Sequence, residues 1–294
     1  MIFEERKNSI EKQKDLDTIL KGFRITRPDE IKNMNILDKI VRDKRVEVEL
    51  RKSLIPVKQL EQSVLFNRNT VSLANNLRNS NTGIIAEHKR RSPSKSVINQ
   101  NLNVQDVAKG YKNASVCGMS VLTDAKYFGG SLDDLLLARA SCNLPLLRKE
   151  FIIDAYQVIE AKGYGADVIL LIAAILDKEE IKQFSELAKS LHLDVLLEVY
   201  NEEELHKSIM PSLDMLGVNN RNLKTFEVSL DTSKALSEMI PNDFVKVSES
   251  GISSIEAIKE LQPYGYQGFL IGENFMKTDN PGASATQFIK ALES

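Results

Sequence analysis

Short apolar runs alternate with longer amphipathic segments from residue 83 to the end of the chain. The apolar runs occupy residues 83–89, 118–123, 144–150, 166–172, 194–199, 216–220, 244–250 and 268–272. Intervening segments such as 103–114, 131–140, 178–191 and 253–263 have helical periodicity with charged outer faces. Strands that alternate with helices predict parallel βαβ units. Eight such units predict an α/β fold of the (β/α)8 TIM-barrel type, with an N-terminal helical extension.

An open, doubly wound sheet is the competing architecture for this pattern. That fold usually carries a GxGxxG turn after its first strand, where it binds a dinucleotide. No such turn follows residues 83–89. The closed barrel is therefore favoured.

The region before residue 83 has a different character. Residues 35–53 predict a docking helix, because the following apolar positions recur at helical spacing: Ile36, Leu37, Ile40, Val41 and Val48. Pro56 ends this helix, and residues 57–66 predict a short second one. Residues 1–34 are polar and lysine-rich, so we expect a mobile arm or a loosely docked helix. The expected domains are this arm, 1–34, and a catalytic barrel, 35–294, that includes the docking helices.

Composition narrows the class of protein. The 294 residues are 42% hydrophobic and 27% charged, as in ordinary soluble globular proteins. The net charge of −2 gives no global basic field, so nucleic acid is not an expected partner. Cys117 and Cys142 lack metal or redox spacing and are expected to be reduced. The charged start and the absence of a membrane-length apolar run predict a cytoplasmic protein without a membrane partner.

Polar residues end most of the apolar runs, and in a (β/α)8 barrel the C-terminal strand ends carry the chemistry. Ile85, Glu87 and Lys89 share one face of the first strand because side chains alternate with period two. A carboxylate and an ammonium are therefore expected to point together into the barrel mouth. The alternative is a buried ion pair that only stabilises the barrel.

Further candidates follow the other runs. Lys126 lies beside aromatic residues and a glycine pair in LTDAKYFGG, where desolvation would make it a better proton donor. The alternative is a solvated loop lysine. Lys149 closes the third run, Glu198 the fifth, and Asn219 with Arg221 the sixth. Each of these residues alone would be read as a surface or structural residue. Together, at corresponding strand ends, they favour one ligand site.

The last two runs end in glycine turns, at Ser250-Gly251 and at Gly272-Glu273, and a helix follows each turn. Glycine lets backbone N–H groups approach an anion, and helix N-termini add positive potential. The loops after strands seven and eight often bind phosphate in this fold. The sequence therefore predicts a phosphorylated small-molecule substrate.

Seven motifs follow one another in the order of the strand ends: IIAEHKRRSPSKS, LTDAKYFGGSLDDL, LPLLRKEF, LLEVYNEEEL, GVNNRNL, VSESGI and FLIGENFM. With the helix NILDKIVRDKRVEV, this region resembles the indole-3-glycerol-phosphate synthase family from Asn35 to the C-terminus. The resemblance implies a carboxy-lyase of tryptophan biosynthesis. It would close the indole ring of 1-(2-carboxyphenylamino)-1-deoxyribulose 5-phosphate with loss of carbon dioxide and water, without a metal or organic cofactor.

The resemblance also implies roles for individual residues. Lys126 would be the general acid and Glu198 the general base or proton shuttle, while Glu87 and Asn219 would orient the amine and the hydroxyls. Lys89 and Arg221 would handle anionic groups, and Lys89 would also serve as an acid in dehydration. The implied substrate-binding set is completed by Ser92, Phe128, Leu147, Glu249, Ser250, Gly251, Leu270, Gly272 and Glu273. Phe128 and Leu147 would form an apolar wall, and residues 90–103 a mobile flap rather than an ordinary connection.

Two positions depart from the family pattern. Glu150 stands where the family usually has aspartate, and His88 replaces an apolar residue and is expected to pack against the surrounding helices. His192 and His206 are expected to face solvent.

Two other functions compete with this one. The first is that of a related barrel enzyme, such as phosphoribosylanthranilate isomerase or the tryptophan synthase α subunit, and the second is a phosphate-binding scaffold without turnover. The former enzymes need an Asp/Cys or Glu/Asp pair, whereas a lysine and a glutamate occupy the candidate positions here.

Overall fold

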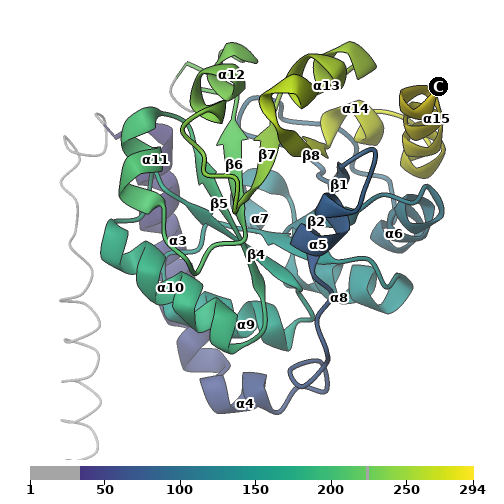
Figure 1. Ribbon diagram of the computed structural model, residues 1–294. Coiled ribbons are helices and arrows are strands. Elements are labelled where there is room, and N and C mark those ends of the chain that lie inside the picture. The colour runs from purple at the N-terminus through teal and green to yellow at the C-terminus, as the bar shows by residue number, and fades with distance from the viewer. Residues whose placement is uncertain (1–33, 223–224) are drawn as a thin grey trace, which may run out of the picture. The chain divides into compact units, whose positions relative to one another are not determined.

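The computed structural model describes residues 34–222 and 225–294. Within these ranges eight parallel strands close into a barrel in the order of the sequence (Figure 1). The strands are β1 (Ile84–His88), β2 (Gly118–Leu122), β3 (Leu146–Lys149), β4 (Val168–Ile172), β5 (Asp194–Val199), β6 (Met215–Asn219), β7 (Val245–Glu249) and β8 (Tyr266–Ile271). The predicted TIM barrel is confirmed, and the open sheet is excluded because β1 pairs with β8.

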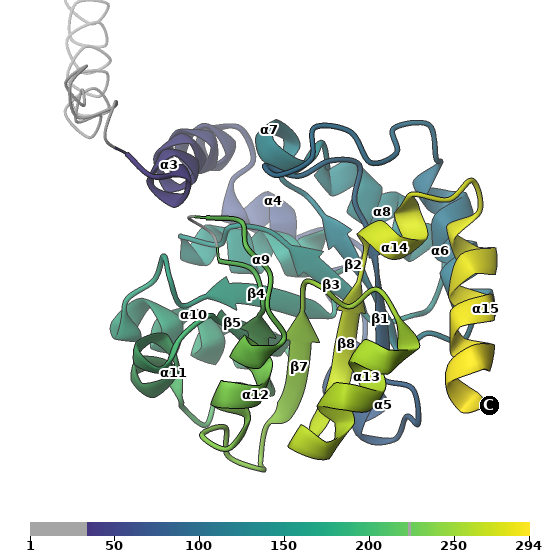
Figure 2. The ribbon, with the colours of Figure 1, turned by 90° about the horizontal axis from the view of Figure 1, so that it is seen from above.

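Helices connect the strands and surround the barrel (Figures 1 and 2). Before β1 lie α3 (Ile36–Leu54), α4 (Val57–Glu61) and α5 (Leu73–Arg78). The later helices are α6 (Val104–Asn113), α7 (Ala125–Phe128), α8 (Leu132–Ser141), α9 (Ala155–Gly163), α10 (Lys178–Ser190), α11 (Glu202–Ser208), α12 (Asp231–Ser237), α13 (Ile255–Leu261), η1 (Gln262–Tyr264), α14 (Glu273–Met276) and α15 (Pro281–Glu293). None of the helices in the described ranges has the length and apolar character needed to cross a membrane.

Of the two helices predicted before the barrel, the first is present as predicted and the second is shorter. The docking helix is confirmed as α3, and Pro56 precedes α4 as expected. The prediction for 57–66 is too long, because α4 ends at Glu61 and Ser63 then donates its hydroxyl to the carbonyl oxygen of Gly163 at 2.7 Å. Residues 1–33 lie outside the described residues, so the arm and the division at residue 34 stay predictions.

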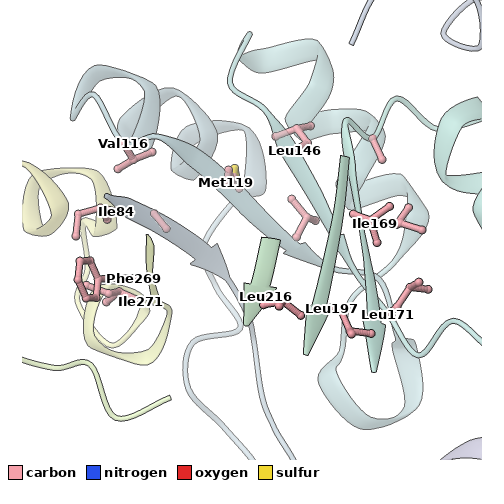
Figure 3. Packing of buried hydrophobic residues seen from close by; sticks show 14 of the residues in the cluster. Ile84, Val116, Met119, Leu146, Ile169, Leu171, Leu197, Leu216, Phe269 and Ile271 are labelled. Atoms are coloured by element: carbon pink, nitrogen blue, oxygen red, sulfur yellow. The ribbon is translucent and has the colours of Figure 1, made fainter. Parts of the chain in front are cut away.

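The outward faces of the strands form the main hydrophobic core together with the helices. Figure 3 shows part of this cluster, including Ile84, Met119, Leu146, Leu197 and Phe269. All of these are essentially inaccessible to solvent. Burial of each such side chain contributes about 1.5–3 kcal/mol, and the helices supply the second surface that makes this burial complete.

The inward faces change from apolar to charged toward the C-terminal ends of the strands. Alternation places Ile85, Leu147 and Leu196 deeper in the barrel and Glu87, Lys149 and Glu198 one step closer to the mouth. Register aligns Glu198 with Gly217 and Asn219 with Glu249 across neighbouring strands. The fold therefore collects these polar side chains at one end of the barrel.

Candidate active site

Glu87 and Lys89 form an ion pair at the end of β1. Lys89 Nζ lies 2.6 Å from Glu87 Oε1, and Ser120 of β2 donates its hydroxyl to Oε2 at 3.3 Å. Burial raises the pKa of Glu87, but Lys89 and Lys149 outweigh burial and hold the pKa below its usual value. The shared face predicted from the period-two pattern is confirmed, and Glu87 is ionised near neutral pH.

Lys149 of β3 links two further carboxylates across the barrel. Its Nζ lies 3.3 Å from Glu198 Oε2 and also contacts Glu249 Oε2. Asn219 donates its side-chain N–H to Glu198 Oε1 at 3.0 Å. Glu198 is therefore held at both oxygens, by an ammonium on one side and an amide on the other.

Glu249 has an unusual environment for a carboxyl group. Its Oε1 is buried and accepts no hydrogen bond from any of the described residues. Burial raises the pKa of Glu249 to about 7, against the opposing effect of Lys149. Burial thus favours the neutral form of this group more than that of an exposed glutamate, although it touches an ammonium.

Two glycines make room for these carboxylates. A Cβ at Gly217 would lie 2.5 Å from Glu249 Oε1, and a Cβ at Gly272 would lie 2.5 Å from Glu87 Oε1. Real Cβ atoms do not approach oxygen so closely, so any larger residue would displace a carboxylate. Gly217 therefore belongs to the site, although the sequence analysis did not select it.

Lys126 lies in a different environment from the barrel-mouth cluster. Its side chain is 64% exposed, and its Nζ lies 2.6 Å from Asp43 Oδ2 of α3. Tyr127 donates its hydroxyl to the same oxygen at 2.6 Å. Figure 2 shows α7, which carries Lys126, beside α3. The expected desolvation of Lys126 is wrong, because α7 turns this side chain outward to a partner 83 positions earlier in the chain.

Asp43 is a strong partner for Lys126 and Tyr127. Burial raises its pKa, but hydrogen bonds from Lys126, Tyr127 and Arg42 outweigh burial and bring the pKa to about 2. Asp43 is consequently ionised throughout the neutral range. The contact anchors the loop after β2 to α3.

A buried ion network lies beneath α7. Lys44 of α3 has its Nζ 2.8 Å from Asp124 Oδ2 and 3.1 Å from Glu150 Oε1. Asp124 caps α7 by accepting the backbone N–H of Tyr127 at 2.6 Å. Glu150 also accepts the hydroxyl of Thr123 at 2.7 Å. Glu150, which stands where the family usually has aspartate, thus takes part in a network that holds the start of α7.

The two turns predicted to bind phosphate differ in backbone shape, since Gly272 has a φ of −116°. Ser250 and Gly251 both adopt positive φ, at 65° and 78°. Two consecutive left-handed residues turn the chain sharply, and Asn220 fixes the turn by donating its side-chain N–H to Ser250 O at 3.1 Å. At the eighth strand, α14 begins directly after Gly272. The Glu273 side chain is engaged by Lys95, whose Nζ lies 2.7 Å from Oε1.

Residues 90–103, predicted to be a flap, connect two sides of the barrel mouth. Arg91 donates to the carbonyl oxygens of Ala125 and Lys126 at 2.8 and 3.0 Å. On the other side, Lys95 reaches Glu273. Ser92 and Lys95 form a tight backbone turn between these contacts. Arg90 pairs with Asp134 of α8.

The remaining predicted residues line the same end of the barrel or its rim. Leu147 and Leu270 are buried at inward positions of β3 and β8. The Phe128 ring packs on Phe151 at a centroid distance of 5.8 Å. Arg221 donates its backbone N–H to Asn219 Oδ1 at 3.0 Å, while its guanidinium donates to Phe226 O at 3.2 Å.

The histidines behave as expected from the sequence. His88 is 1% exposed and faces away from Glu87 and Lys89, toward the outer helices. Burial and Arg90 lower its pKa to about 4, so it is neutral at pH 7. His192 and His206 are exposed.

Sequence reasoning named Lys149 among the strand-end residues but gave it no role, and it did not select Ser120, although a signal existed for both. Each occupies an inward position in a strand, two residues from another inward side chain. The period-two alternation, followed to the C-terminal residue of each strand, places both side chains inside the barrel. Within the described ranges no group of three or more His, Cys, Asp or Glu has the geometry of a metal site.

A parallel (β/α)8 barrel with carboxylate and ammonium groups at its C-terminal end, and glycine turns after strands seven and eight, is typical of the phosphate-binding barrel enzymes. Solved structures support the fold. The chain is similar to 3-hexulose-6-phosphate synthase from Salmonella typhimurium, with a TM-score of 0.58, 13% identity, and coverage of 72% of this chain and 98% of that chain. Thiamine phosphate pyrophosphorylase from Pyrococcus furiosus gives a TM-score of 0.55 and 16% identity, covering 76% of this chain and 98% of that one.

Sequence comparison identifies the family within this class. The family model for indole-3-glycerol phosphate synthase matches residues 37–291. The indole-3-glycerol phosphate synthase of Bacteroides thetaiotaomicron is 46% identical over 259 residues, covering 88% of this chain and 99% of the relative. That of a Polaromonas species is 44% identical over 257 residues, covering 86% and 97%. The chain belongs to the indole-3-glycerol phosphate synthase family, as its motifs predicted.

Proposed function

We propose that the chain closes the indole ring of 1-(2-carboxyphenylamino)-1-deoxyribulose 5-phosphate and releases indole-3-glycerol phosphate, carbon dioxide and water. The aromatic carbon that bears the carboxylate attacks the ketone carbon, and the ketone oxygen takes up a proton. The carboxylate then leaves as carbon dioxide, which restores the aromatic ring. Finally the nitrogen lone pair expels the protonated hydroxyl as water, and a base accepts the proton released.

Glu198 is the proposed base of this sequence. The observation that carries the proposal is its fixation at both oxygens, by Lys149 and Asn219, at the inward end of β5. A base fixed in this way loses little orientational freedom when it acts. Glu87, held by Lys89 and Ser120, would orient the amine and the ribulosyl hydroxyls together with Asn219.

Lys126 is the proposed acid for the ketone, and Lys89 a further acid for the departing hydroxyl. The exposed Lys126 side chain has a flexible four-carbon stem, so its ammonium can leave Asp43 and turn toward a bound substrate. Proton transfer from a positioned side chain contributes typically about 10²–10⁴-fold to the rate. Acid and base would thus approach the substrate from α7 and from β5.

The binding groups divide into an anion side and an apolar side. Ser92, Ser250, Gly251, Gly272 and the backbone N–H of Glu273 would hold the phosphate, with Arg221 and Lys89 near anionic groups. Phe128, Leu147 and Leu270 would contact the aromatic ring, and Glu249 would complete the barrel floor beneath the substrate.

We place the protein in the cytoplasm as an enzyme of tryptophan biosynthesis. Its buried, unpaired cysteines, Cys117 and Cys142, are consistent with a reducing compartment.

The test is the fluorescence increase that accompanies indole formation after mixing purified protein with the substrate in buffer containing EDTA. The wild type is expected to give a metal-independent signal. Lys126→Ala should reduce turnover by roughly 10²–10⁴-fold with little change in substrate affinity. A near-wild-type rate in this variant would remove Lys126 from the acid role. Binding without any signal in the wild type would instead favour a non-catalytic scaffold.

A further inference from the structure

One buried amide lies behind the turn after β7, away from the charged groups of the barrel mouth. Asn220 directly follows β6 and is 1% exposed. Its side-chain nitrogen donates to Ser250 O at 3.1 Å and to Ser248 Oγ at 2.9 Å. Its Oδ1 accepts the backbone N–H and the hydroxyl of Ser233 at 3.2 and 2.8 Å. Both ends of the amide are therefore engaged, and one bond reaches the turn that is predicted to bind phosphate.

The residue that accepts this bond has an unfavourable backbone conformation. Ser250 has a φ of 65°, and Gly251 after it has a φ of 78°. Glycine adopts the left-handed region readily, whereas a residue with a Cβ does so at an energetic cost. The net contribution of one hydrogen bond has a size similar to that cost. The bond from Asn220 can therefore decide whether Ser250 keeps this conformation.

The position of Asn220 is itself fixed by neighbouring elements. Its carbonyl oxygen accepts the backbone N–H of Ser229 at 3.0 Å. Ser233 of α12 shares a hydrogen bond with Ser248 of β7 at 2.8 Å. Tyr266 of β8 donates its hydroxyl to the carbonyl oxygen of Ser233 at 2.6 Å. Helix α12 and the ends of three strands thus share one uncharged network, and this network includes the bond to the turn.

The loop that begins at Asn220 also packs against the turn. A Cβ at Gly251 would lie 2.6 Å from Cγ1 of Val228. Val228 in turn forms a backbone bridge with Arg221, which directly follows Asn220. The turn is therefore held by a hydrogen bond at Ser250 and by a van der Waals contact at Gly251.

We propose that Asn220 is a positioning residue for the phosphate group, which holds Ser250 in the left-handed conformation and so directs the backbone N–H groups of the turn toward the anion. This inference rests on the proposed function, because the phosphate site after β7 belongs to that proposal. Within the described residues the Asn220 side chain bonds to Ser233, Ser248 and Ser250, so its effect on the anion is indirect. An amide that only stabilised the fold would leave the affinity for phosphate unchanged.

Removal of this amide should weaken anion binding and leave the chemical step unchanged. In Asn220→Ala the turn loses the bond that holds Ser250, and the backbone can relax away from the left-handed region. The Kd for inorganic phosphate and the KM for the substrate should therefore rise about 3–10-fold. A change in uniform binding raises KM without lowering kcat, so kcat at saturation should change less than about twofold.

The experiment is a calorimetric titration with inorganic phosphate, combined with steady-state kinetics on the same preparations. Asn220→Ala is compared with the wild type and with the matched control Asn76→Ala. Asn76 of α5 also donates its side-chain N–H to a backbone carbonyl, that of Cys117 at 3.0 Å, but it does so just before β2. The control should leave the Kd for phosphate at its wild-type value. An unchanged Kd in Asn220→Ala, or an equal rise in Asn76→Ala, would overturn the proposal.

Glycine at position 250 separates positioning from a general loss of stability. Ser250→Gly adopts the left-handed conformation at little cost, so Asn220→Ala should raise the Kd less in this background than in the wild type. The same factor in both backgrounds contradicts the proposal. If Asn220→Ala does not fold, Ser233→Ala carries the test, because it removes a donor to Asn220 Oδ1 and loosens the amide. Its Kd should rise about 2–5-fold, and an unchanged value overturns the positioning role.

Phosphate binding also distinguishes this inference from the proposed function. A wild type that binds phosphate without turnover, together with weaker binding in Asn220→Ala, overturns only the proposed ring closure and supports the positioning role. A wild type that does not bind phosphate overturns both the anion site and the role of Asn220.

Discussion

Two buried ion networks lie on opposite sides of the barrel wall. The inner network joins Lys149 to Glu198 and Glu249 at the barrel mouth. The outer network joins Lys44 of α3 to Asp124 and Glu150 beneath α7. Lys44 also contacts Glu47 Oε2 of its own helix at 2.8 Å, and both networks link residues that are far apart in the sequence.

The two networks differ in how completely their carboxylates are satisfied. Glu150 accepts from Thr123 and from the backbone N–H of Phe151, in addition to its contact with Lys44. Glu249 has an oxygen without a donor among the described residues, and burial raises its pKa to about 7. Asp124 Oδ2 in the outer network also lacks a hydrogen bond, but it lies 2.8 Å from Lys44 Nζ, whereas the ion pair of Glu249 is made through its other oxygen, Oε2. A buried carboxyl oxygen without a cation beside it takes up a proton more readily. The outer network is therefore expected to control stability and the inner one the chemistry.

The largest expected effect tests the inner network. Glu198→Gln keeps the size of the side chain and removes its basicity, so kcat should fall by about 10²–10⁴-fold. The unfolding temperature should change little, because Lys149 retains Glu249 as a partner. Steady-state kinetics and thermal unfolding of the same preparation give both quantities. A large loss of stability with modest loss of kcat would reverse the division between the two networks.

The second largest effect is expected on stability, when the outer network is broken. Lys44→Met leaves Asp124 and Glu150 buried without their ammonium, and breaking a buried pair in this way costs about 3–5 kcal/mol of unfolding free energy. Lys52→Met on the same helix is the matched control, since Lys52 is about one-third exposed and pairs with Glu49 and Asp154. An exposed pair contributes only about 0–1 kcal/mol. Urea unfolding measures both variants, and equal losses would contradict the importance given to burial.

The smallest effect concerns the position where the family usually has aspartate. Glu150→Asp shortens the side chain by one methylene, so it cannot keep its contacts with Lys44, Thr123 and Phe151 N at once. Loss of one hydrogen bond should lower the unfolding free energy by about 1 kcal/mol, with kcat unchanged. A large fall in kcat would instead show that Glu150 acts on the reaction through α7.

The sequence predicted the barrel because its signals are local. Each strand is a short apolar run, and period two fixed which residues of β1 face inward, so Glu87 and Lys89 were correctly paired. The prediction that Lys126 is desolvated was wrong, because the direction of that side chain depends on Asp43, which lies on a separate helix. The four-residue helix α7 was also too short to give a periodic signal. Contacts across the barrel, such as that of Lys149 with Glu249, depend on closure and on register, which no local pattern specifies.

We propose that the barrel-mouth cluster carries out a decarboxylating ring closure. The most direct test is to incubate the protein with substrate labelled with ¹⁴C in the carboxyl group and to measure the released carbon dioxide and the indole product together. The wild type is expected to release one carbon dioxide for each indole ring formed, and Glu198→Gln to release almost none in the same time. Tight binding of the substrate without labelled carbon dioxide from the wild type would contradict the claim.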